Sequence, residues 1–75
     1  MKKLTELKIG EEKKIIVVDG SAPPKIKRRL LELGFTSGQT VKIVRKSMLG
    51  ETLLIQLRGY SISMRKNLAN YLIVE

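Results

Sequence analysis

The hydrophobic pattern changes its period within residues 30–39. Before this stretch, Ile26, Leu30 and Leu33 recur at i, i+4 and i+7, a spacing that places them on one face of a helix. After it, residues 40–46 alternate between apolar and polar side chains, as a strand with one buried face does. We therefore predict a helix that is joined to a strand through a short polar turn.

Both ends of the predicted helix carry residues that commonly start and stop one. Pro23 and Pro24 stand in or just before the first turn, where a missing N–H does no harm. Gly34 stands where a helix closes with a left-handed residue. The next residue, Phe35, is then expected to fold back onto the last helical turn.

The other apolar stretches are short and predict strands. We predict strands at residues 15–18, 40–46, 52–58, 60–65 and 71–74, with one helical turn within residues 65–70. Ahead of the first strand, Leu4, Leu7 and Ile9 are expected to lie on the core. The charged residues 11–14 are expected to be exposed.

These elements predict a mainly β fold, namely a small SH3-like barrel of about five strands in one domain spanning residues 1–75. Five short strands without a second layer of helices must cover their edges, and closing into a barrel does this. A single helical turn directly before the last strand is typical of SH3-like barrels. The α-helix then occupies the first long loop and is expected to cap one end of the barrel.

The composition argues against an enzyme. The chain has no histidine and no cysteine, which removes the commonest metal ligands and the usual general base near neutral pH. A serine–lysine pair stays formally open, but small polar positions on strands are far more often ordinary outer-face residues. No glycine-rich stretch has the Gly-Lys-Ser/Thr of a phosphate-binding loop. We expect no catalytic residue, no metal site and no cofactor.

The charge points to an anionic partner or simply to a well-solvated surface. The 15 lysines and arginines outnumber the 7 acids, giving a net charge of +8. Such an excess raises affinity for RNA, DNA, anionic lipid or an acidic protein surface. Single-strand binders usually interleave aromatics with basic residues, whereas Phe35, Tyr60 and Tyr71 all fall where the pattern predicts core or helix-end packing.

No stretch is long enough to span a membrane. The longest apolar runs have four residues, against the roughly 20 that a membrane-spanning helix needs. The basic start is not followed by an apolar region, so it does not resemble a signal peptide. We expect a cytoplasmic protein without direct membrane insertion.

Residues 29–41 resemble the core motif of the FeoA family, small cytosolic proteins of bacterial ferrous-iron uptake. Their sequence R-L-L-E-L-G-F-T-S-G-Q-T-V follows the family pattern R-L-x-E-L-G-[LF]-x-x-G-x-x-[VI]. Residues 4–10 resemble the family's opening L-x-x-L-x-x-G, and residues 59–69 resemble its segment G-x-x-[IL]-[AS]-[LM]-R-x-x-x-A. One departure is that the loop at residues 46–51 lacks the proline often seen there.

The resemblance implies an SH3-like barrel and a role beside FeoB, a membrane ferrous-iron transporter with a cytosolic GTP-binding domain. It implies an accessory or regulatory protein that acts by protein–protein contact with the cytosolic region of such a transporter. The domain also occurs as the C-terminal module of iron-dependent repressors, but this chain has no room for a helix-turn-helix, which favours the stand-alone type. The alternative function is a basic barrel that binds RNA or another polyanion.

Candidate partner-binding residues lie outside the predicted core. They are Lys25, Lys27, Arg28 and Leu31 on the helix exterior and Met48 and Leu49 in the loop after residue 46. Leu31 and Leu49 are apolar residues that the pattern does not clearly bury, which makes them possible contact points. The alternative is that both pack against neighbouring loops. Exposed apolar residues would also support self-association, so a homo-oligomer stays open.

Overall fold

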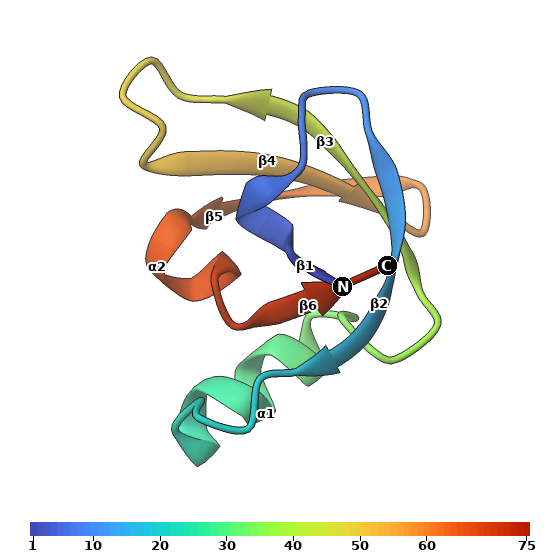
Figure 1. The fold of residues 1–75 in the computed structure, drawn as a ribbon, viewed down its shortest axis with the longest axis vertical. Helices are drawn as coiled ribbons and strands as arrows, with labels where there is room; N and C mark the ends of the chain where they lie inside the picture. The colour runs from blue at the N-terminus through green and yellow to red at the C-terminus, as the bar shows by residue number, and fades with distance from the viewer.

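The computed structural model describes all 75 residues as one strongly curved sheet of six antiparallel strands with two short helices (Figure 1). The strands are β1 (Lys2–Lys3), β2 (Glu12–Val18), β3 (Thr40–Lys46), β4 (Thr52–Leu57), β5 (Tyr60–Arg65) and β6 (Leu72–Val74). The helices are α1 (Pro24–Glu32) and α2 (Lys66–Ala69), and a 3-10 turn η1 spans Leu4–Glu6. The strand order is β1-β6-β2-β3-β4-β5. The predicted mainly β, SH3-like barrel is confirmed.

Alternate residues of the strands fill the interior of the barrel. Leu53, Ile55 and Leu57 of β4 are at most 2% exposed, as their alternation predicted. Phe35 and Leu30 are fully buried and close the interior where α1 meets the sheet. No polar or charged residue is buried. The core is therefore purely apolar, and any polar recognition takes place on the surface.

The sheet gains a sixth, very short strand at the start of the chain. Lys2 and Lys3 form β1 and pair with Val74 and Ile73 of β6. The two ends of the chain consequently lie side by side (Figure 1). Two exposed lysines carry no hydrophobic alternation, so the sequence pattern gave no sign of this strand.

The prediction for Ile9 was wrong. Leu4 and Leu7 are fully buried, as expected, but Ile9 is 60% exposed. It lies beside Gly10, whose positive φ of 90° belongs to the turn that leads the chain into β2. The side chain therefore leaves the core with the turn. The strand after it also starts earlier than predicted, because residues 12–14 pair with residues 40–42 of β3.

The helix and two loops occupy opposite ends of the molecule. The structure measures 29 × 23 × 23 Å. Helix α1 lies at one end of the longest axis, and the β3–β4 loop (residues 47–51) and the turn at residues 8–11 lie at the other (Figure 1). The predicted placement of the helix at one end of the barrel is confirmed. Any docking surface on α1 is therefore remote from these loops.

Candidate functional site

The outer side of α1 is basic because its apolar residues are confined to one stripe. Leu30 is buried, and Ile26 and Leu33 pack against the core. The outward positions carry four cations against one anion, all exposed: Lys25, Lys27, Arg28, Arg29 and Glu32. The helix thus presents a fixed row of positive charge to solvent.

The C-terminal end of α1 is held by three hydrogen bonds. The N–H of Phe35 donates to the carbonyl of Leu30, and the N–H of Gly34 donates to the carbonyl of Leu31, each over 3.1 Å. This pair of bonds, with Gly34 at a φ of +106°, is a Schellman motif. The hydroxyl of Tyr60 donates to the carbonyl of Leu33 over 2.9 Å. These contacts fix the direction of α1 on the barrel.

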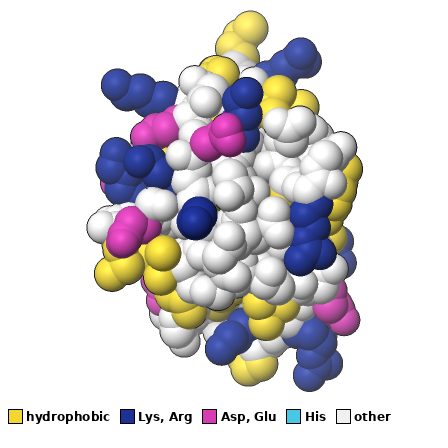
Figure 2. All heavy atoms as spheres, turned by 90° about the vertical axis from the view of Figure 1, so that its right-hand side faces the viewer, with side chains coloured by type: hydrophobic (Ala, Val, Ile, Leu, Met, Phe, Trp, Pro, Cys, Tyr) yellow, Lys and Arg dark blue, Asp and Glu magenta, His cyan; other side chains and the backbone are white.

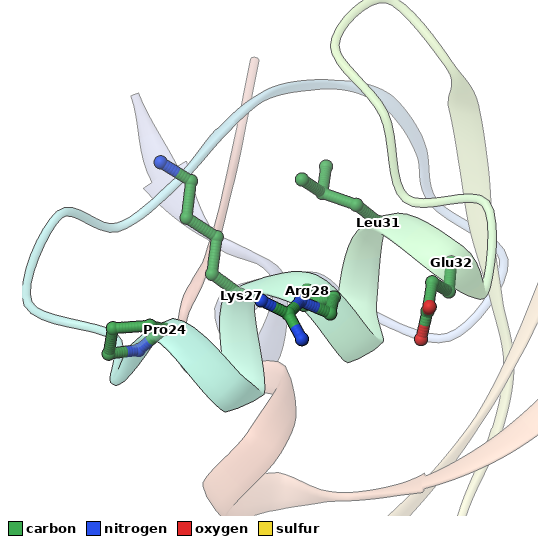
Figure 3. Close-up of a pocket in the computed structure, with 5 residues that line it drawn as sticks. All are labelled: Pro24, Lys27, Arg28, Leu31 and Glu32. Carbon is green, nitrogen blue, oxygen red and sulfur yellow. The ribbon is translucent and has the colours of Figure 1, made fainter.

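A shallow hollow runs along the exposed side of α1. It is lined by Pro24, Lys27, Arg28, Leu31 and Glu32 (Figure 3). Lys27 and Leu31 project to the same side of the helix, so an apolar side chain lies beside a cationic one (Figure 3). Leu31 is 41% exposed, so it is not a core residue. This exposure agrees with the hydrophobic pattern, which did not clearly bury Leu31.

The other two candidate residues lie elsewhere. Met48 and Leu49 are 100% and 83% exposed at the tip of the β3–β4 loop, at the end of the molecule opposite α1. The structure therefore does not bring the six predicted partner-binding residues together. It divides them into a helix group and a loop group.

Sequence reasoning missed a second depression, which lies between α1 and α2. Its lining is Ile26, Ser63, Met64, Arg65, Asn67, Leu68 and Tyr71. Ile26 is only half-buried, although its helical spacing predicted that it shares the apolar face with Leu30. Periodicity shows which face of a helix is apolar, but it does not show how completely a neighbouring element covers that face.

Two carboxylates are occupied in holding turns. The N–H of Lys8 donates to Glu11 Oε1 over 2.9 Å, and this hydrogen bond, with smaller contributions from nearby lysines, lowers the pKa of Glu11. The N–H of Ser21 donates to Asp19 Oδ1 over 2.9 Å, and bonding to Ser21 likewise lowers the pKa of Asp19. Both acids thus have local roles next to glycine-containing turns.

No three His, Cys, Asp or Glu side chains converge in a way that would hold a metal ion. Neither helix has the length and apolar composition needed to cross a bilayer. No buried side-chain nitrogen or oxygen lacks a hydrogen-bond partner. The surface features that remain for recognition are the α1 face, the depression beside it and the two exposed loops.

Comparison with known proteins gives consistent matches. The model of the FeoA domain matches residues 2–75. An FeoA-like protein from Clostridium acetobutylicum is 31% identical, with a TM-score of 0.88 over 99% of this chain and 84% of that one. FeoA from Stenotrophomonas maltophilia, solved in complex with zinc and described as a prokaryotic SH3 domain protein, is 35% identical, with a TM-score of 0.82 over 96% of this chain and 87% of that one.

A third relative joins the domain to a transporter. The Fe(2+) transport protein A/Fe(2+) transporter FeoB fusion protein of Porphyromonas gingivalis is 30% identical over 73 residues. The match covers 97% of this chain but only 8% of that protein. Because the family model spans nearly all of the sequence and the fold agrees with solved members, the chain belongs to the FeoA family.

Proposed function

We propose that this chain is a cytoplasmic, non-enzymatic accessory protein of ferrous iron uptake. It contacts the cytosolic, GTP-binding region of a FeoB-type transporter through the exposed face of α1. The observation that carries the proposal is the Porphyromonas gingivalis relative, in which a segment similar to this chain shares one polypeptide with a FeoB transporter. Fusion holds two domains at high effective concentration, which supports the idea that their separate counterparts also meet.

The α1 face has the properties expected of a docking surface. Its C-terminal end is held in place by the Schellman motif and by the Tyr60 hydroxyl. The face carries an apolar centre at Leu31 with Lys27 and Arg28 around it in the same hollow. A central apolar contact with a charged rim is the usual anatomy of a protein–protein interface. The predicted partner surface is acidic, with an apolar contact for Leu31.

A calorimetric titration of the full chain against the cytosolic domain of the transporter tests the proposal. It is run without nucleotide, with GDP and with a non-hydrolysable GTP analogue. We expect binding in at least one nucleotide state, and we expect Leu31→Asp to weaken it by about tenfold or more. Because Leu31 is 41% exposed, this substitution should leave the fold intact. GTPase activity measured with and without the chain then shows whether binding alters the transporter's cycle.

Leu49→Asp is the matched control, since it makes the same change at the opposite end of the molecule. It should leave the affinity for the transporter domain unchanged. Absence of binding in all three nucleotide conditions would reject the proposal. If Leu31→Asp and Leu49→Asp lose the same amount of affinity for the transporter domain, the contact cannot be assigned to α1.

The rival function is RNA binding, which the net charge of +8 favours. Two features count against it. Phe35 is fully buried, and Tyr60, although 45% exposed, has its hydroxyl bonded to the end of α1. The chain has only three aromatic residues, so it lacks the row of exposed rings on which single-strand binders stack bases. A salt series on a mixed-sequence RNA separates the two functions, because polyanion binding weakens steeply as salt rises. If the chain is not retained on RNA even at low salt, the RNA-binding function is excluded.

A further inference from the structure

The β3–β4 loop places two adjacent apolar side chains fully in solvent. Met48 is 100% exposed and Leu49 is 83% exposed. The turn at residues 8–11, with Ile9 at 60% exposure, lies at the same end of the barrel (Figure 1). Adjacent exposed apolar side chains such as Met48 and Leu49 can mark an interaction site, whereas singly scattered ones are ordinary.

Cationic side chains surround the tip. Arg45 and Lys46 end β3 just before the loop, and both are at least partly exposed. Arg65 and Lys66 lie on the other side, where the N–H of Lys66 donates to the carbonyl of Glu51 over 2.7 Å. Leu49, Arg65 and Lys66 line one hollow together with Glu51, the only acid of the loop.

Figure 2 shows this end of the molecule at the top of the view. Hydrophobic side chains project beyond the rest of the surface there, with Lys and Arg side chains on both sides of them and some Asp and Glu side chains below (Figure 2). Apolar side chains at the apex with cations set behind them match the layering of an anionic bilayer. Its acyl chains lie deepest, and its headgroup phosphates lie at the surface.

We infer that the β3–β4 end of the barrel docks peripherally on anionic lipid bilayers. Met48 and Leu49 enter the boundary between headgroups and acyl chains, and Arg45, Lys46, Arg65 and Lys66 contact the headgroup phosphates. A protein surface is the less favoured occupant, because an isolated two-residue tip offers little area for a stable protein interface. The contact is shallow and reversible, since two apolar side chains and a few cations give weak membrane affinity.

No helix of the chain can span a bilayer, and the contact at the loop is peripheral. The contact uses residues of the β3–β4 end and none of the α1 face, so it is independent of the proposed function. If both hold, the bilayer and the transporter's cytosolic domain contact opposite ends of the same 29 Å molecule. The α1 face then points away from the membrane.

The test is flotation of the full chain with vesicles. One set contains phosphatidylcholine alone, and the other contains about one third phosphatidylglycerol to supply negative charge. We expect the chain to float with the anionic vesicles and not with the neutral ones, and to lose binding at high salt. Replacing both apolar tip residues (Met48→Ser with Leu49→Ser) should reduce the bound fraction by about tenfold. Leu31→Ser, at the opposite end, should leave it unchanged.

Circular dichroism and thermal unfolding of each variant establish that the fold is retained. No binding to anionic vesicles at any salt concentration overturns the inference. Equal binding by the parent and the doubly substituted tip variant also overturns it, because charge alone would then explain the association. If the tip variant binds vesicles normally but no longer binds the transporter domain or itself, the loop is a protein contact and the inference is wrong.

Discussion

The hydroxyl of Tyr60 donates a hydrogen bond to the main-chain carbonyl of Leu33, 27 residues earlier in the chain. Leu33 is the C-cap residue of α1, where the helix cannot supply its own donor. Tyr60 is the first residue of β5. One side chain therefore links the end of the candidate docking helix to the start of β5.

Tyr60→Phe removes this hydrogen bond and keeps the aromatic ring. We expect the free energy of unfolding to fall by about 0.5–1 kcal/mol, the low part of the usual range, because Tyr60 is 45% exposed and water can replace its hydroxyl. Urea unfolding followed by circular dichroism measures the change. An unchanged midpoint would show that the bond contributes nothing to holding α1.

Gly34→Ala should destabilise the protein by about 1–2 kcal/mol, because Gly34 has a φ of +106° that side chains rarely adopt. An added Cβ would also lie 3.0 Å from the Tyr60 hydroxyl and 3.3 Å from Leu57 Cδ1. The measurement is the same urea titration on Gly34→Ala alone and combined with Tyr60→Phe. The combined loss should be smaller than the sum of the single losses, since Phe removes the crowded hydroxyl. If the loss in the double variant equals the sum of the two single losses, the added Cβ at residue 34 does not crowd the Tyr60 hydroxyl.

Acid should weaken the fold partly through Glu11 and Asp19. The pKa of each is lower in the folded state than its ordinary value of 4.5 or 3.8, mainly because a backbone N–H donates to the carboxylate. The unfolded chain therefore binds these protons more tightly. The stabilisation is fully present above the ordinary pKa and is lost as pH falls through the folded pKa. Unfolding midpoints measured from neutral to acidic pH should fall less steeply for Glu11→Gln than for the parent. If the parent and Glu11→Gln lose stability equally as the pH falls, the hydrogen bond between Lys8 and Glu11 is not a source of stability.

We expect no tight, stoichiometric Fe(II) site on this chain. It has no histidine or cysteine, and its acids do not gather in groups of three. Anaerobic calorimetric titration with Fe(II) should show only weak, salt-sensitive heats, and a chelator should leave the melting temperature unchanged. Tight binding of about one Fe(II) per chain through protein oxygens would overturn this expectation.

The hydrophobic period was sufficient to predict most of the barrel. Residues such as Leu30, Ile55 and Val41 are buried where alternation or helical spacing placed them. The period could not reveal β1 or the early start of β2, because Lys2, Lys3 and residues 12–14 join the sheet through backbone pairing alone. It also misassigned Ile9, whose exposure depends on the path of a turn.

The candidate site was predictable only in part. The sequence identified the outward residues of α1 and the apolar pair at Met48 and Leu49, because none of them fits a core stripe. It could not show that these groups lie at opposite ends, since their separation follows from the curvature and strand order of the whole sheet. The depression beside α1 is lined by residues of α1, β5 and α2, which come together only in the folded chain.

The pairing of Lys2 with Val74 has a consequence for how such a barrel is attached to other proteins. Because both ends of the chain emerge at one point (Figure 1), a polypeptide can enter and leave the domain through a single narrow stalk. A barrel carried in this way keeps the pairing of its two ends, because the connections leave from next to β1 and β6. Both the helix end and the loop end then remain free to reach separate surfaces.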